Sequence, residues 1–457
     1  MLRTRSRPPA SPLTAIADAI EPLRGGARDY DPLLELVGDA RFVLIGEASH
    51  GTHEFYAERA AITKRLILEK DFAAVCIEGD WPDAYRVDCY LKNQSNDASA
   101  DEALEGFKRF PTWMWRNEVV RDFIGRLREY NDTVREDRRI GFYGLDLYSM
   151  YGSIEAVLTY LDRVDPEAAR RARYRYSCFE HFGEDSQAYG YAAASSAAES
   201  CEQDAVHALV ELRSRALDYA QRDGRRASDE YFSAEQNARL VHNAEQYYRS
   251  MFRGRHSSWN LRDRHMAETL LAVEQHLNAT GRAAKLVVWA HNSHLGDARY
   301  TDMSRRGELN LGQLARERYG DNDVRLIGFS THAGTVTAAH DWDEPGRQRR
   351  VRPSLEDSYE RAFHEVTVDR NAPRFLLRMR EETDATRALA SSRLQRAIGV
   401  IYRPETERWS HYYLATLPRQ FDAVIHIDST SALRGLEPGE QWEGGVEEPP
   451  ETFPSGI

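Results

Sequence analysis

The sequence has few cysteines and no long apolar run, and both absences narrow the class of protein. Only four of its 457 residues are cysteine, and none forms a CxxC pair. This spacing predicts neither a zinc cage nor a disulfide framework, and it favours a reducing compartment. No segment approaches the ~20 apolar residues that cross a bilayer. The opening MLRTRSRPPASPL lacks the apolar centre of a secretory signal. We therefore expect a cytoplasmic protein, although an organellar transit peptide would be similarly basic.

Positive charge is also scarce. Lysine and arginine total 61 against 73 acidic residues, which gives a formal net charge of -12. Because binding to nucleic acid or to a membrane surface needs clustered cations, we expect neither partner. The 41% hydrophobic and 29% charged residues are typical of a globular protein with a sizeable core. This composition fits a monomer and a dimer equally well.

Short apolar runs bounded by turn residues predict buried strands. They lie at 42–45, 73–77, 140–143, 285–290, 324–329, 397–402 and 423–427. Helical patterns at 54–70 and 118–130 alternate with them. Such alternation is typical of the α/β class, so we predict a central, mostly parallel β-sheet flanked by helices.

The chain is expected to contain an insertion. From 165 to 277 the sequence becomes polar and alanine-rich with helical periodicity. We interpret this stretch as a helical insertion between two parts of one core, at 13–164 and 278–435. It would serve either as a packing accessory or as a lid over the sheet's carboxyl edge, and we favour the lid. Residues 1–12 are predicted to be a disordered basic arm and 436–457 a tail outside the core.

The segment FVLIGEASHG at 42–51 places Glu47 and His50 directly after a predicted strand. Open α/β sheets bind ligands at this position, and the carboxylate could orient the imidazole and raise its basicity. A solvated pair or a helix cap is the simpler reading of two such residues taken alone. Ser49 does not stand in a GxSxG elbow, so we expect it to cap the following helix rather than act as a nucleophile.

Other predicted strands end in similar residues. Glu78 follows the run at 74–77, His291 and His294 follow 285–290, and Asp146 lies beyond 140–143. Glu78 or Asp80 could simply cap the next helix, whereas histidines after an apolar strand need polar partners. Because the ends of parallel strands meet at one edge of a sheet, we expect these side chains to form one site.

Some residues carry weaker signals. The aromatic block at 113–117, which contains Arg116, is more typical of a core than of a substrate pocket. Arg262 and Asp263 lie at the start of a predicted helix, where such a pair is usually a surface ion pair of little consequence. Arg59, on the helix predicted after His50, is interpreted in the same way. The sequence has no GxGxxG turn after a strand and no Walker loop, which argues against a nucleotide-binding enzyme.

The blocks around these residues resemble the erythromycin esterase family, which includes proteins labelled as succinoglycan biosynthesis proteins. The resemblance covers 42–433 and rests on GEASHGTHEF, EGDWPDA, FYGLDLYS, WAHNSHLGD and ERWSHYYLATLPRQFDAVIHID. It implies a central sheet with helices around it, a cleft beneath a helical portion, and hydrolysis of an ester by water without a covalent serine intermediate.

The resemblance also implies roles for individual residues. His50 matches the family's general base, and Glu47 lies beside it. Glu78 and His291 match its other essential acid and histidine. Arg59 and Arg262 match arginines of its cleft, where a guanidinium could hold a carbonyl or stabilise an oxyanion, so the resemblance implies that both bind substrate. We add Asp146 and His294 as substrate-binding candidates because of their positions at strand ends.

Three hypotheses follow. The first is a cofactor-free hydrolase of a small-molecule ester or lactone, with macrolides as one candidate substrate. The second is a hydrolase that holds a divalent metal between the same glutamates and histidines, although no HExxH spacing supports it. The third is a protein that binds a small or haem-like ligand in the same cleft without chemistry.

Overall fold

A computed structural model describes residues 11–436 except 183–184, 196–198, 221–223, 253–254 and 280. The predicted basic arm and tail lie outside these residues, apart from residues 11 and 12 at the start of the first helix and residue 436. None of the helices in the described ranges is long and apolar enough to cross a membrane.

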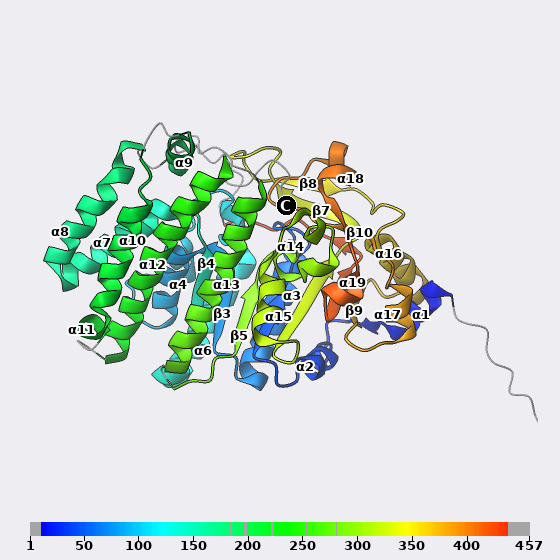
Figure 1. Cartoon of the computed structure of the whole chain (residues 1–457). Coiled ribbons are helices and arrows are strands. Elements are labelled where there is room, and N and C mark those ends of the chain that lie inside the picture. The colour runs from blue at the N-terminus through cyan, green and yellow to red at the C-terminus, as the bar shows by residue number, and fades with distance from the viewer. Residues whose placement is uncertain are drawn as a thin grey trace, which may run out of the picture.

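An eight-stranded sheet forms the centre of the molecule, in the order β1-β9-β12-β6-β2-β5-β3-β4 (Figure 1). The pairings from β12 to β4 are parallel, and β9 pairs antiparallel with β12 and β1. The strands are β1 Glu21–Pro22, β2 Phe42–Ile45, β3 Ala74–Asp80, β4 Gly141–Asp146, β5 Leu286–Trp289, β6 Val324–Ser330, β9 Arg374–Arg378 and β12 Ala423–Ile427. The molecule therefore has a mixed α/β fold with a parallel-rich sheet.

Both faces of the sheet are covered, which explains why its strands are apolar at nearly every position. Phe42 and Leu44 point into one buried core and Val43 and Ile45 into another. The second core is closed by α2 Asp31–Val37, α3 His53–Lys70, α4 Trp81–Leu91, α5 Ala100–Leu104 and α6 Glu118–Thr133.

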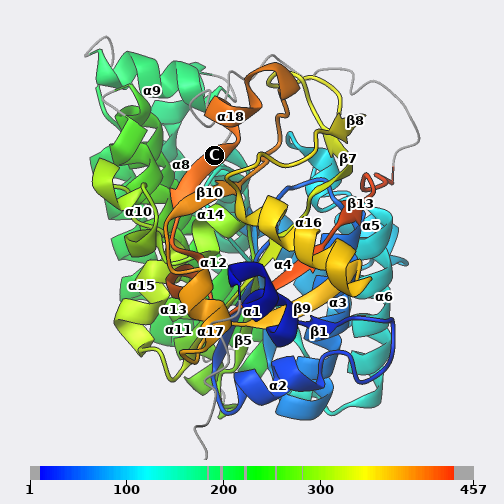
Figure 2. The same cartoon turned by 90° about the vertical axis from the view of Figure 1, so that its right-hand side faces the viewer.

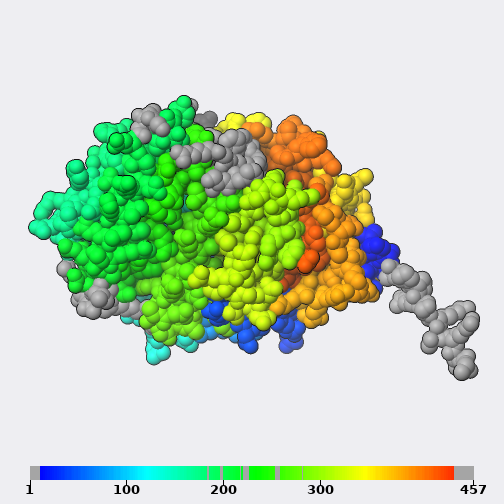
Figure 3. Space-filling view, viewed as in Figure 1, coloured from blue at the N-terminus to red at the C-terminus, as the bar shows by residue number. Residues whose placement is uncertain are grey.

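The first core extends into a large group of helices that packs around α12 (Figure 1). These helices are α7 Met150–Val164, α8 Pro166–Tyr176, α9 Ser186–Ala194, α10 Glu202–Ser214, α11 Ala216–Ala220, α12 Gly224–Met251 and α13 Arg255–Ala279. Helix α13 lies between this group and the sheet, in contact with β4 and α15. Figure 3 shows the group as a continuous green surface against the second half of the chain.

The remaining helices complete the same side and the far edge of the sheet. They are α1 Pro12–Ala19, α14 Asn292–Leu295, α15 Leu311–Tyr319, α16 Tyr359–Arg370, α17 Asp384–Ala388, α18 Glu407–Ser410 and α19 Leu417–Gln420. Figure 2 shows α1 and α16 beside β1 and β9 at this edge.

The second half of the chain also forms two small sheets outside the central one. One pairs β10 Arg393–Arg396 with β11 Tyr412–Ala415, and the other joins β13 Ser429–Thr430, β7 Ala333–Ala338 and β8 Arg347–Val351. Strand β7 supports the loop after β2, because the Thr337 amide donates a 2.9 Å hydrogen bond to the Gly51 carbonyl. The small sheet thereby fixes the loop that carries His50.

Two sequence-based expectations about strands and cysteines are wrong. The run at 397–402 is not a strand: it makes only isolated bridges, from Ile398 to Ser49 and from Ile401 to Ala339. Its apolar character reflects burial, because Ile398 and Tyr402 form a buried cluster with side chains of β7 and β8. Cys178 and Cys201, whose spacing predicted no disulfide, are joined by one within the helical group.

Candidate active site

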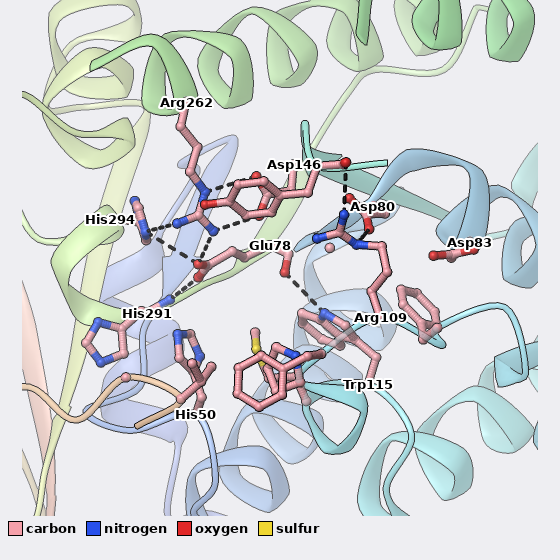
Figure 4. Close-up of a pocket in the computed structure, with 18 of the residues that line it drawn as sticks. His50, Glu78, Asp80, Asp83, Arg109, Trp115, Asp146, Arg262, His291 and His294 are labelled. Carbon is pink, nitrogen blue, oxygen red and sulfur yellow. Dashed lines mark hydrogen bonds and ion pairs between the residues drawn. The ribbon is translucent and has the colours of Figure 1, made fainter. Parts of the chain in front are cut away.

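A cavity opens where β2, β5, β3 and β4 end side by side (Figure 4). It contains about 850 Å³ of space not filled by protein atoms, including the part open to solvent. Each strand contributes polar side chains to its wall, as parallel strands do at their carboxyl edge. Of the predicted residues, those that line the cavity are His50, Glu78, Asp146, Arg262, His291 and His294.

His50 is held by a buried acid. Its Nδ1 lies 2.9 Å from Oε1 of Glu47, whose side chain is fully buried. The other carboxylate oxygen of Glu47 lies 2.7 Å from Nη2 of Arg59. When Nδ1 donates to the carboxylate, the ring keeps its lone pair on Nε2. The His50 ring is thereby set up to accept a proton from a group in the cavity.

Arg59 lies behind this pair and not at the cavity wall. Its guanidinium is fully buried, with its carbon 4.2 Å from the centre of the Tyr56 ring and 5.0 Å from that of Trp289. The Tyr56 hydroxyl donates a 3.0 Å hydrogen bond to the His50 carbonyl. Helix α3, which begins three residues after His50, thus carries the residues that fix the His50 loop from beneath.

A second cluster is centred on Arg262 of α13. Its Nε and Nη2 contact the two oxygens of Asp146 at 3.0 and 2.6 Å, and Nη2 also contacts Oε1 of Glu78 at 2.7 Å. The backbone N–H of His291 donates a 2.8 Å hydrogen bond to the other Glu78 oxygen. Glu78 is therefore fixed at both oxygens by groups from α13 and from the loop after β5.

His294 of α14 connects this helix to α13 through contacts with Arg262 and Asp263. Its Nδ1 lies 3.0 Å from both oxygens of Asp263, and its Nε2 lies 3.1 Å from Nη1 of Arg262. Trp259 stacks on the ring at 4.5 Å between centroids. Arg262 and Asp263 thus form no surface ion pair, because both are buried and point to different partners.

The His291 ring faces His50 across the cavity, with 4.8 Å between ring centroids. Its Nδ1 accepts a hydrogen bond from the Ser293 backbone N–H, because His291 caps α14. A neutral imidazole carries one proton, so with Nδ1 as an acceptor the proton resides on Nε2. His291 therefore offers a neutral donor opposite the His50 base.

Burial and neighbouring charges shift the pKa values of these groups. Burial opposes the charge of Glu78, but His294, Arg262, His50 and the His291 N–H outweigh it and hold the Glu78 pKa well below its usual range. Burial, reinforced by the charge of His50, lowers the pKa of His291. Burial also opposes protonation of His294, but Asp263 and Glu78 raise its pKa. The site thus combines an ionised Glu78 with a neutral His291.

Several cavity residues were missed from the sequence. Asp80 was read only as a possible helix cap, and Asp83, Arg109 and Trp342 were not singled out. Their positions depend on loops whose packing local spacing does not encode. Ser49 was expected to cap α3, but the cap position is held by Thr52.

Glu78, Asp146 and His294 are arranged around Arg262, whereas Glu47 and His50 form a separate pair beside Arg59. Within the described ranges, no group of three His, Cys, Asp or Glu side chains has an arrangement that could hold a metal ion. The Arg262 guanidinium already pairs with Asp146 and with Glu78, which is one of the two glutamates of the metal hypothesis.

Comparisons with known proteins agree with this arrangement of the fold. The chain is 24% identical over 326 residues to an erythromycin esterase type II of Escherichia coli, covering 68% of this chain and 74% of that protein. A crystal structure described as a succinoglycan biosynthesis protein has a TM-score of 0.75 at 21% identity, covering 94% of this chain and all of that one.

Two further crystal structures share the fold. A Bacillus cereus protein has a TM-score of 0.76 at 19% identity, covering 93% of this chain and 98% of that one. A mutant of the erythromycin esterase EreC in its open conformation has a TM-score of 0.62 at 20% identity, covering 90% and 96%. The model of the erythromycin esterase family matches residues 67–430. The chain belongs to the erythromycin esterase family.

Proposed function

We propose that this protein hydrolyses a carboxylic ester or lactone of a small molecule, with His50 as the general base that activates water. The observation that carries the proposal is the 2.9 Å contact between His50 Nδ1 and the buried Glu47. It leaves Nε2 as the basic atom at the cavity wall, and it stabilises the imidazolium that forms when water loses its proton. Membership of the erythromycin esterase family supports the same reaction class.

His291 is proposed to stabilise the reaction's developing negative charge. Its Nε2–H, directed by the Ser293 contact to Nδ1, is a donor that does not titrate near neutral pH, because burial keeps the ring uncharged. Glu78 accepts the His291 backbone N–H and so holds the loop that carries the ring. An oxyanion donor of this kind contributes about 3 kcal/mol in well-studied hydrolases.

We propose that Arg59 positions Glu47 from behind the cavity wall, whereas Arg262, which lines the cavity, both positions acids and keeps its proposed place next to the substrate. The Arg262 guanidinium joins Glu78, Asp146 and His294, and Arg59 lies behind Glu47. Asp146 and His294 keep their proposed place next to the substrate, because both line the cavity.

We also propose that the reaction needs no metal ion. The carboxylates that could ligate a metal are already paired with a buried guanidinium, whose positive charge disfavours a second cation at the same oxygens. A metal-dependent reaction through the same cluster would first require Arg262 to move away.

The helical region at 165–277 is proposed to act as a lid on the cavity. Helix α13 supplies Arg262 to the cavity wall and places Trp259 against His294. Closure of such a region excludes water from the reacting centre. Hydrogen exchange of the α13 amides that slows when a cavity ligand binds would support the lid, whereas unchanged exchange would contradict it.

Hydrolysis of a panel of aryl esters, lactones and macrolides tests the proposed function. The wild type and the His50→Ala variant are assayed with and without a chelator, and circular dichroism checks the fold of the variant. We expect turnover by the wild type that survives chelation and falls at least 100-fold in the variant. Full turnover by His50→Ala would refute the mechanism, and chelator-sensitive turnover would favour the metal alternative.

A further inference from the structure

A second groove lies among the helices that close the second core, away from the active-site cavity. It is lined by α3, by α6 and by the loop at 23–30 that follows β1. The groove contains about 1700 Å³ of space not filled by protein atoms, including the part open to solvent. It shares no lining residue with the active-site cavity, so it is a separate site.

The lining of this groove is largely apolar. The short side chains of Ala57, Ala60 and Ala61 on α3 leave room beside Phe123 and Leu127 on α6. These residues recur at helical spacing, so the apolar surface continues along both helices. A continuous apolar surface of this size commonly marks a place where a partner binds.

Two cations on the lining are available to such a partner. Lys64 of α3 and Arg126 of α6 are exposed, and neither forms an ion pair with another residue that the structure describes. The other charged side chains that line the groove already have partners: Arg65 pairs with Asp31 and Glu69, Arg374 with Glu58, Asp122 with Arg121, and Asp29 accepts the N–H groups of Arg24 and Gly25. A partner that carries carboxylates would therefore complement the groove.

Glu58 adds an unused hydrogen-bond acceptor. It is 8% exposed, and its Oε1 lies 3.2 Å from Nη1 of Arg374. Its Oε2 has no hydrogen-bond donor among the described residues, and burial outweighs Arg374 and raises the pKa of Glu58. Because buried carboxylate oxygens normally have a donor, the groove favours a partner that brings an N–H together with apolar surface.

The described chain ends beside this groove. Its last segment crosses the first turns of both helices, and Figure 2 shows β13, which precedes it, above α3 and α6. At the start of the segment, the Ser431 backbone N–H and hydroxyl donate to Glu54 of α3 at 2.8 and 2.7 Å. At its end, the Leu436 N–H donates a 3.0 Å hydrogen bond to the carbonyl of Arg116, two residues before α6. Val119, three residues after Arg116, already lines the groove.

The residues that follow, 437–457, match the groove in chemistry. They contain six glutamates and neither lysine nor arginine. Trp442 lies between Glu440 and Glu443, and its indole combines a large apolar surface with one N–H donor. The six residues from Leu436 to Trp442 can span about 20 Å, whereas the lining of α6 from residue 119 to 130 extends over about 17 Å. The indole can therefore reach any point along the groove.

We propose that residues 437–457 dock in this groove, with the Trp442 indole between α3 and α6 and with Glu440 and Glu443 beside Lys64 and Arg126. Exposed ion pairs contribute little by themselves, so the apolar contact of the indole supplies most of the affinity. The tether at Leu436 keeps the effective concentration of the segment high. The docking does not depend on the proposed hydrolysis, because the groove and the cavity are separate.

Photo-cross-linking in the whole chain tests the docking. p-Benzoylphenylalanine replaces Trp442, the dilute protein is irradiated, and the cross-linked peptides are identified by mass spectrometry. We expect most cross-links to lie within one chain and to join residue 442 to 57–68 of α3 and 119–130 of α6. The same probe in place of Trp409, which is 85% exposed on α18, is the control and should give at least fivefold fewer cross-links within the chain.

Charge reversal distinguishes specific docking from chance contact. Lys64→Glu combined with Arg126→Glu should lower the yield of these cross-links at least fivefold, and adding Glu440→Lys and Glu443→Lys to the same chain should restore it. Arg170→Glu, which reverses an exposed arginine of α8, should leave the yield unchanged. Circular dichroism and thermal unfolding check that each variant keeps its fold.

Each alternative gives a different result, and each would overturn the proposal. Cross-links to the arginine-rich strand β8 would place the segment elsewhere on the molecule, and cross-links between isotope-labelled and unlabelled copies would place it on a second chain. A small apolar molecule retained in native mass spectrometry, without cross-links to α3 or α6, would assign the groove to a ligand. Absence of cross-links, or a yield on α3 and α6 that ignores charge reversal, would equally contradict the docking.

Discussion

At the scale of single residues, the site depends on how buried charges are matched. Glu47 and Arg59 are both fully buried, and each is the other's charge partner. Removal of either one leaves an uncompensated charge in the core, which costs far more than loss of an exposed ion pair. The orientation of His50 by Glu47 therefore depends on Arg59, which does not reach the cavity.

A double-mutant cycle measures this coupling. Arg59→Met should lower the free energy of unfolding by about 3 kcal/mol, and Glu47→Gln in the same background should restore part of the loss. Arg65→Met on the same helix is a matched control. It removes pairs with the half-exposed Glu69 and Asp31, so we expect a loss of at most about 1 kcal/mol. Urea unfolding gives the free energy of unfolding of the wild type, of the two single variants of the cycle, of the double variant and of the control. Strictly additive effects of Arg59→Met and Glu47→Gln would contradict the coupling.

The sequence was informative at residues that directly follow strands. Glu47, Glu78, Asp146 and His291 could be placed at one edge because parallel strands end together. Arg262 could not, because it reaches the site from a helix more than 100 residues away from Glu78, which it contacts. Nothing in a local pattern distinguishes a buried arginine of this kind from a surface one.

At the scale of elements, the loop between β2 and α3 fixes the reactive residues. Gly51 lies against β7, and a Cβ at this position would overlap the Thr337 carbonyl oxygen. The loop thus depends on glycine for close backbone approach, not for an unusual backbone conformation.

A pair of glycine substitutions tests this dependence. Gly51→Ala should destabilise the protein by about 2 kcal/mol, because backbone must shift to admit the methyl group, and should reduce turnover by displacing His50. Gly125→Ala, within α6 and facing open space, should instead stabilise by about 0.5–1 kcal/mol. Thermal unfolding and kcat distinguish the two. Unchanged stability of Gly51→Ala would show that the loop can move without cost.

The apolar pattern of the sequence located the parallel strands of the central sheet but not the antiparallel strands at its edge. Strands β2, β5 and β6 were expected from runs that are apolar on both faces, and the structure contains them. Strand β9 has arginine at both ends, so its sequence resembles a loop although it pairs with β12. The run at 397–402 shows the opposite case, because it is apolar and buried against β7 and β8 but forms only isolated bridges. The apolar content of a segment therefore indicates that it is buried, whereas its pairing as a β-strand depends on which strands lie beside it in the fold.

At the scale of the whole molecule, buried histidines make stability depend on pH. Burial lowers the pKa of His265 to about 3 and that of His411 to about 4, whereas in the unfolded chain histidine has a pKa of about 6.5. Between these values the unfolded state binds more protons than the folded state. Stability is therefore lost as pH falls below about 6.5, and it is retained above that pH.

Each of these histidines should lower the free energy of unfolding by about 2 kcal/mol between pH 7 and pH 5. His411→Gln should flatten the dependence of stability on pH over this window. His207→Gln, at an exposed position on α10, should leave the slope unchanged. Denaturant unfolding at several pH values provides the slopes, and equal slopes for wild type and His411→Gln would show that His411 does not titrate as described.

The most direct test of the account is the rescue of His50→Ala by added imidazole. The variant vacates a ring-sized space beside Glu47, so free imidazole should bind there and restore turnover of a good ester substrate in a saturable manner. The rescue should be much weaker when Glu47→Gln is added, because the carboxylate orients the ring. Such a result would establish His50 as the general base positioned by Glu47. Wild-type turnover by His50→Ala without imidazole would contradict the central claim.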